Sequence, residues 1–134
     1  MKKMMIIGSV LFIALFSGCL EDSPSSPCIC TEEFRTIFNV VIGPDGNPVD
    51  SMAVIVKDPA SGTVYQLLSG YPPYSHWNLV MSDQFRQNFS NTPKKIIFIA
   101  EKDTLRVEQE YSIISDNCNC HVYKAAGPDT IYIK

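Results

Sequence analysis

Two Cys-x-Cys pairs constrain the fold of this chain more than any other feature. Cys28 and Cys30 lie in a polar segment near the start, and Cys118 and Cys120 lie near the end, in NCNCH (117–121). An even number of cysteines in a small exported domain is typical of disulfide bonds. In an extended strand residues i and i+2 point to the same face, so two neighbouring strands that carry these pairs can be joined twice.

The spacing leaves three connectivities open. Antiparallel neighbours would join Cys28 to Cys120 and the two inner cysteines to each other. Parallel neighbours would join them in order, Cys28 to Cys118 and Cys30 to Cys120. Closing each Cys-x-Cys on itself would need a strained small ring. A bridge that closes a loop of about 90 residues would add roughly 4–5 kcal/mol in the chain-entropy model, so we expect the cysteines to act as staples.

The same cysteines have a rival interpretation, in which they bind a metal or exchange electrons. Structural zinc sites usually place two to four residues between paired cysteines, and an extended Cys-x-Cys holds its thiols apart. A redox cysteine needs a helix N-terminus or a cation beside it, and only His121 is near. In a strand, His121 would also face away from Cys120. We therefore expect no metal, no cofactor and no thiol catalysis.

Residues 1–18 have the layout of a secretory signal peptide. Two lysines precede an apolar run over residues 4–16, which is too short to span a bilayer comfortably. The tetrapeptide FSGC (16–19) resembles the bacterial lipobox, although Phe16 replaces the usual leucine. The resemblance implies that Cys19 is lipidated and becomes the new N-terminus. An ordinary signal peptide or an uncleaved anchor helix is the alternative.

Charge and the residues after Cys19 bear on localisation. Without residues 1–18 the chain keeps 9 basic and 14 acidic side chains, a net charge of −5. This balance disfavours nucleic acids and anionic lipid surfaces as partners, which leaves the acyl chains to hold the membrane. Glu21 and Asp22 resemble the export signal of surface lipoproteins, and Leu20 is not the Asp that commonly retains lipoproteins at an inner membrane. We expect a lipid-anchored protein of the bacterial cell envelope, at the outer membrane or cell surface.

Residues 19–30 read as a Ser/Pro-rich tether and residues 31–134 as one domain made of strands. A loop or short helix is expected near 84–89, and GPDGNP (43–48) is dense in turn-forming residues. Strands are expected over 34–42, 51–58, 63–69, 77–81, 94–102, 103–114, 120–124 and 130–134. In the first of these, one face carries Phe34, Thr36, Phe38, Val40 and Ile42, and the other carries Arg35, Ile37, Asn39 and Val41. Without a long helical period, this pattern predicts an all-β fold, an antiparallel β-sandwich of about seven strands.

The segment FNVVIGPDGNPVDSMAVIVKDPASGTVYQL (38–67) resembles the carboxypeptidase regulatory-like (transthyretin-like) domains, an Ig-like type of sandwich. The likeness covers 30 of 134 residues. The matching residues are Asp45, Gly46, Pro48, Val49, Ala53, Val54 and Val56. Further along, MSDQFRQNF (81–89) lacks the glycine of the family's Thr-Asp-x-x-Gly-x-Phe. The resemblance implies a sandwich that binds, spaces or supports and has no catalytic residues of its own.

Four ring-bearing side chains fall close together: Tyr71, Tyr74, His76 and Trp77. Exposed, they would form a patch that stacks on sugar rings or anchors a protein partner. A small domain needs its largest apolar side chains inside, so we expect Trp77 in the core with the tyrosines covering it. The binding patch is the alternative, and His76 is expected to be a loop histidine rather than a general base.

The sequence contains no phosphate-binding loop, nucleophile elbow or paired metal-binding carboxylates. Ser82, Asp83 and Asp116 are interpreted as turn and cap residues. It therefore predicts a non-enzymatic, lipid-anchored accessory or binding module. Its partners would be the membrane, through the lipid, and a protein or glycan. The alternative is a metal-binding or thiol-redox lipoprotein that uses the two Cys-x-Cys pairs.

Overall fold

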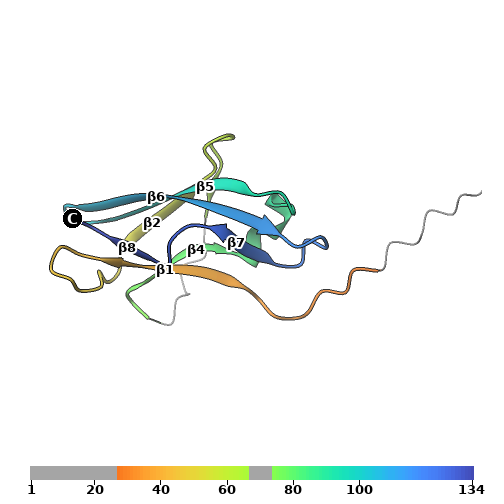
Figure 1. Cartoon of the computed structure of the whole chain (residues 1–134), viewed down its shortest axis with the longest axis horizontal. Helices are drawn as coiled ribbons and strands as arrows, with labels where there is room; N and C mark the ends of the chain where they lie inside the picture. The colour runs from red at the N-terminus through yellow and green to blue at the C-terminus, as the bar shows by residue number, and fades with distance from the viewer. Residues whose placement is uncertain (1–26, 67–73) are drawn as a thin grey trace, which may run out of the picture.

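The structure is a computed structural model that describes residues 27–66 and 74–134. The expected lipidation site Cys19 and the aromatic Tyr71 lie outside these residues. Eight strands form two sheets that pack face to face (Figure 1), so the expected all-β sandwich is confirmed. None of the helices in the described part of the chain is long and apolar enough to cross a membrane.

The smaller sheet has the order β4-β1-β8 and the larger one the order β3-β2-β5-β6-β7. A 3-10 helix, η1 (Asp83–Asn88), follows β4, near where a loop or short helix was expected. The strands are β1 (Thr36–Ile42), β2 (Ala53–Lys57), β3 (Val64–Tyr65), β4 (Trp77–Ser82), β5 (Lys94–Lys102), β6 (Leu105–Ser115), β7 (Val122–Ala126) and β8 (Thr130–Tyr132).

The structure corrects three sequence-based expectations about the strands. The described strands pair antiparallel with one exception. β1 and β8 run parallel, with Val40 opposite Thr130. The chain reaches β8 by crossing from the larger sheet to the smaller one after β7, and a crossing allows a parallel pair where a hairpin does not. Within the described residues β3 covers only Val64–Tyr65 of the strand expected over 63–69, whose residues 67–69 lie outside them, and β7 begins at Val122 instead of residue 120.

The alternation predicted for the first strand sorts its two faces. Asn39 and Val41 are 1% and 0% exposed and face the other sheet, whereas Phe38, Val40 and Ile42 are only partly buried. Both sheets contribute apolar side chains to one core. Its buried members are Val41, Val56, Tyr65, Val80, Met81, Phe89, Ile96, Phe98, Ala100, Tyr111, Ile113, Val122 and Ile131.

Tyr111 on β6 joins the two sheets inside this core. Its hydroxyl accepts a hydrogen bond from Asn39 Nδ2 on β1 at 2.8 Å and donates one to the Pro128 carbonyl oxygen, between β7 and β8, at 2.9 Å. Gly127 lies against the tyrosine ring with φ +124°, and a Cβ at this position would overlap the ring. Burial raises the pKa of the Tyr111 hydroxyl to about 12.

We expect Tyr111→Phe to lower the free energy of unfolding by about 1–3 kcal/mol, because the buried Asn39 amide and Pro128 carbonyl lose their partner. Tyr132→Phe is the matched control, since the Tyr132 side chain is 71% exposed. It should change the free energy by less than about 0.5 kcal/mol. Urea unfolding at neutral pH measures both values.

The raised pKa of Tyr111 also makes the fold sensitive to alkali. The unfolded chain loses this proton near pH 10 and the folded chain only near pH 12, so stability falls as the pH rises between these values. Tyr111→Phe should lack this part of the alkaline loss, and Tyr132→Phe should keep it. Identical alkaline unfolding profiles for the two variants would contradict this account of Tyr111.

Candidate functional site

The four cysteines are joined in order, Cys28 to Cys118 and Cys30 to Cys120. The Cα atoms of the two pairs are 5.5 and 5.3 Å apart, and each bond spans 90 residues of sequence. This is the connectivity considered for parallel neighbours. The expectation that strands carry the cysteines was wrong, because residues 27–35 have no regular structure and the other pair lies in a turn with Asn119 at φ 53°.

Asp116 holds this turn between β6 and β7. Its Oδ1 accepts hydrogen bonds from the backbone N–H groups of Cys118 (3.1 Å) and Cys120 (2.8 Å). Its Oδ2 accepts one from the N–H of His121 at 3.2 Å. A carboxylate that binds its own backbone in this way is the usual device of an Asx turn. The interpretation of Asp116 as a turn residue agrees with these contacts.

A polar trio, in which Asp83 and His121 are buried and Thr31 is exposed, adjoins the disulfides. His121 Nδ1 lies 2.7 Å from Asp83 Oδ2, and His121 Nε2 lies 2.9 Å from the hydroxyl oxygen of Thr31. The Asp83 carboxylate also accepts the N–H of Arg35 at 2.8 Å and the N–H of Val122 at 2.7 Å. Asp83 is 2% exposed and His121 6% exposed. Three segments that are distant in sequence therefore meet on one carboxylate.

We call the two disulfides together with Thr31, Asp83 and His121 the N-terminal clamp. The His121 and Asp83 side chains are only 8% and 3% exposed. The trio's contacts join the segment before β1 to η1 and to the start of β7.

Sequence reasoning treated Asp83 as a local turn or cap residue and placed His121 on the far face of a strand. Both interpretations missed the trio, because its members are 38 and 90 residues apart in sequence. The only sequence signal near the trio was the polar segment DQFRQN (83–88) after β4. Within residues 27–66 and 74–134, no three His, Cys, Asp or Glu side chains are grouped to hold a metal ion.

Tyr74, His76 and Trp77 form an aromatic patch where β4 begins. Tyr74 stacks on His76 with ring centroids 5.7 Å apart and meets the edge of Trp77 at 5.2 Å. Trp77 also packs against Phe38 of β1 at 5.4 Å. Tyr74 is 56% exposed and Trp77 is half-buried.

The expectation that Trp77 occupies the core was wrong. Trp77 pairs with Val40, and both belong to the partly buried face of the sheet rather than to the face with Asn39 and Val41. Alternation along β4 places Val80 in the core instead. Of the four residues proposed for the alternative aromatic patch, the three that the structure describes lie together, and Tyr71 is outside the described residues.

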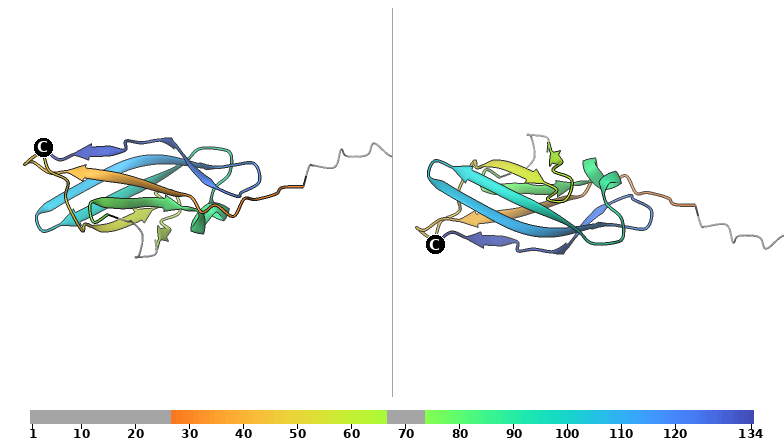
Figure 2. Two further views of the ribbon diagram at one scale, coloured as in Figure 1. Left: turned by 90° about the horizontal axis from the view of Figure 1, so that it is seen from below. Right: turned by 90° about the horizontal axis from the view of Figure 1, so that it is seen from above.

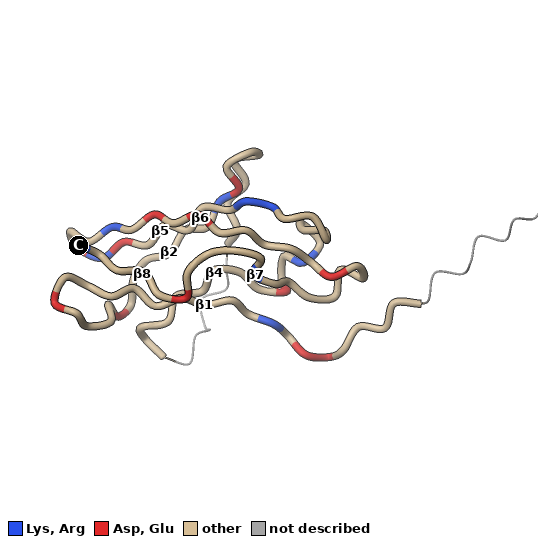
Figure 3. The backbone as a smooth tube through the Cα atoms, in the orientation of Figure 1, with Lys and Arg blue, Asp and Glu red and all other residues tan. Residues whose placement is uncertain are grey.

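The outer face of the smaller sheet carries no charged side chain from its strands. β1, β4 and β8 contain no Asp, Glu, Lys or Arg, whereas β5 contains four and β6 contains three. Figure 3 shows this difference between the sheets. The apolar side chains on this face are Phe38, Val40, Ile42, Trp77, Leu79 and Tyr132, of which Leu79 is buried and Tyr132 is 71% exposed.

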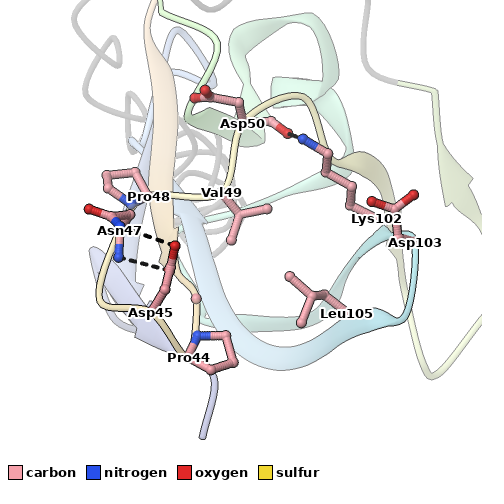
Figure 4. A pocket seen from close by; sticks show the side chains of 10 residues that line it. Pro44, Asp45, Asn47, Pro48, Val49, Asp50, Lys102, Asp103 and Leu105 are labelled. Carbon is pink, nitrogen blue, oxygen red and sulfur yellow. Dashed lines mark hydrogen bonds between the residues drawn. The ribbon is translucent and has the colours of Figure 1, made fainter.

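A pocket of about 420 Å³ opens beside this face, between the β1–β2 loop and the β5–β6 turn (Figure 4). We call it the distal pocket. Val49 and Leu105 form an apolar part of its wall, and the Lys102 amine spans it to donate to the Asp50 carbonyl oxygen at 2.7 Å. Its other polar lining residues are Asp45, Asn47 and Asp103.

Asp50 connects the distal pocket to the aromatic patch. Its Oδ1 accepts the Ser75 hydroxyl at 3.0 Å and lies 4.0 Å from His76 Nδ1. The N–H of Ser51 donates to the Ser75 carbonyl oxygen at 2.8 Å. Since Ser75 stands between Tyr74 and His76 in the sequence, these contacts place one lining residue of the pocket next to the patch. The turn-forming segment GPDGNP (43–48) was the only sequence signal for this pocket. It did not indicate that the β5–β6 turn forms the other wall.

Comparisons with protein-family models, with curated proteins and with solved structures find no match to this chain. The resemblance to carboxypeptidase regulatory-like domains therefore stays a prediction. The function has to be inferred from the clamp, the patch and the pocket.

We expect the two disulfides to stabilise the fold non-additively. Both close nearly the same loop, so Cys28→Ser with Cys118→Ser should cost little while the second bridge remains. Replacing all four cysteines by serine should lower the free energy of unfolding by about 4–5 kcal/mol. Guanidinium unfolding measures both variants. Two equal and additive losses would contradict the shared-loop explanation.

Asp83→Ala should lower the free energy of unfolding by about 3 kcal/mol or more, because the donors of Arg35, His121 and Val122 lose a buried acceptor. Thr31→Ala removes one hydrogen bond from a partly buried pair and should cost about 0.5–1.5 kcal/mol. Glu108→Ala, at an exposed position of β6, is the control and should stay within about 0.5 kcal/mol of the original. Urea unfolding with intact disulfides is the measurement. A small loss for Asp83→Ala would exclude this carboxylate as the anchor of the clamp.

Proposed function

We propose that this chain is a non-enzymatic, lipid-anchored module of the bacterial cell envelope that binds a protein or glycan partner through its aromatic patch. The anchor is Cys19, and the membrane is the outer membrane or the cell surface. The observation that carries the binding role is the aromatic patch on an uncharged outer sheet face.

The position of the patch supports the proposal. The segment before β1 leaves the sandwich at one end, and the β1–β2 loop lies at the other (Figure 2). The patch contacts this loop through Ser75 and Asp50. A lipid on Cys19 would hold the first end near the membrane, so the patch and the pocket would face away from it.

The N-terminal clamp suits an anchored domain. A force on the tether would act on the fold at Cys28 and Cys30. The two disulfides would transmit it to the turn before β7. The covalent bonds keep the segment before β1 attached to the domain. The rival function has less support: metal binding needs free thiolates, whereas the four cysteines are bonded to one another, and thiol redox chemistry is favoured by a helix N-terminus, whereas these cysteines lie in irregular segments.

The anchoring part is tested with Cys19→Ala in the full chain, expressed in a bacterial host. The original chain should incorporate labelled palmitate and sediment with membranes, and the variant should do neither, because no other lipidation site is expected. Cys28→Ser with Cys118→Ser is the control and should still be lipidated. Equal labelling of the Cys19 variant would exclude this anchor.

The binding part is tested with the lipidated chain on phosphatidylcholine liposomes, mixed with isolated cell-envelope fragments. Tyr74→Ala and Trp77→Ala should each weaken co-sedimentation by about 30-fold if these rings are binding hot spots. Phe34→Ala is the matched control, since Phe34 is 58% exposed and lies at the clamp end. Binding that survives both patch variants would exclude the patch as the binding surface.

A further inference from the structure

The geometry points to a specific ligand class for the distal end of the sandwich: we infer that the distal pocket and the aromatic patch together bind a short stretch of uncharged saccharide. This inference rests on the proposed binding function and names its ligand. The aromatic rings would stack on one sugar ring, and the pocket would receive the hydroxyl groups of the next.

The distal pocket offers hydrogen-bond donors and acceptors side by side. Asp45, Asp50 and Asp103 are acceptors, Lys102 is a donor, and the Asn47 amide provides both functions. Asn47 donates from its side chain and its backbone to Asp45, each at 3.0 Å, which holds the pKa of that carboxyl below its usual value. A lining of both kinds matches hydroxyl groups, because each hydroxyl donates one hydrogen bond and accepts others.

The charges of the pocket disfavour ions as ligands. An anion would meet the acidic lining residues Asp45 and Asp103 and, on the side of the patch, the carboxylate of Asp50. A cation would meet the ammonium group of Lys102, which spans the pocket to the Asp50 carbonyl oxygen. An uncharged polyhydroxyl ligand uses both kinds of group and brings no charge that must be desolvated.

The apolar parts of the surface match the faces of sugar rings. Tyr74 is 56% exposed and lies 5.2 Å from Trp77, so the two rings present an aromatic platform, and His76 beside them lies 4.0 Å from Asp50 of the pocket lining. Val49 and Leu105 continue the apolar contact into the pocket wall. An amphipathic ligand with alternating apolar faces and hydroxyl edges fits such a mixed lining. The volume of about 420 Å³ is in the usual range for small-ligand pockets.

Asp50 links the two halves of the site. One side of its carboxylate accepts the Ser75 hydroxyl, which fixes the turn that carries Tyr74 and His76. The Asp50 side chain is still 57% exposed, so it can accept a ligand hydroxyl as well. A substitution at Asp50 should therefore affect pocket and platform together, whereas one at Asp103 should affect the pocket alone.

The experiment uses the full lipidated chain in phosphatidylcholine liposomes, titrated with maltohexaose, cellohexaose and xylohexaose. Hexalysine and the envelope-protein fraction are probed in parallel. Trp77 is the only tryptophan of the chain, so its fluorescence reports on the patch directly. We expect at least one hexasaccharide to shift this emission to the blue, because the bound sugar excludes water from the half-buried indole. Calorimetry supplies the dissociation constants.

Tyr74→Ala should weaken saccharide binding by about 30-fold. Asp50→Asn and Asp103→Asn keep the side-chain shape and remove a charged acceptor, so each should weaken it about tenfold. The controls are Phe34→Ala, an exposed aromatic at the clamp end, and Glu110→Gln, a charge removed from β6. Both should bind within about twofold of the original. Circular dichroism of each variant verifies that it is folded.

Each other outcome overturns the inference in a distinguishable way. Binding of hexalysine but of no hexasaccharide would show a cation site. Binding of envelope proteins alone, lost in Tyr74→Ala, would overturn the saccharide inference and leave the proposed function standing. Saccharide binding unchanged by Asp50→Asn and Asp103→Asn would exclude the pocket. No patch-dependent binding of any probe would overturn the inference and the proposed function together.

Discussion

The hydroxyl of Tyr111 is the interaction on which the arrangement of the two sheets depends. It bonds Asn39 in the smaller sheet and the Pro128 carbonyl where the chain passes from β7 to β8. Without this crossing, β8 could not run parallel to β1 and complete the smaller sheet. Gly127 is required at the crossing because the Tyr111 ring occupies the space of a Cβ. One buried tyrosine thus sets both the sheet packing and the path of the last strand.

The N-terminal clamp acts at the opposite end of the same strands. Two disulfides and the carboxylate of Asp83 hold the entering chain against the turn before β7. Residues 27–35 contain no strand, but the two disulfides and the hydrogen bond from Arg35 to Asp83 hold them against the domain. The clamp also gives the molecule a direction, since the chain enters beside β7 and the exposed aromatic rings lie toward the β1–β2 loop. A binding surface at that end would lie away from the proposed anchor.

The two outer faces of the sandwich have different chemistry. The charges of β5 and β6 keep one face hydrated, whereas the strands of the smaller sheet leave the other face uncharged and rich in aromatic rings. Leaving large rings partly exposed costs a small domain some of the burial that stabilises it. The proposed binding function gives these rings a role that folding alone does not require. The neighbouring pocket supplies the polar groups that the sheet face lacks.

Strand alternation, turn residues and cysteine spacing determined the fold class, most strand positions and the two faces of β1 from the sequence, because these are local properties of the backbone. The sequence also offered Tyr74, His76 and Trp77 as a patch, although it favoured Trp77 in the core. Only the tertiary structure decided three other features. These are the face of β4 that turns inward, the pairing of the cysteines, and the contact of Asp83 with Thr31 through His121. Each depends on how segments up to 90 residues apart pack together, and no local pattern encodes that distance.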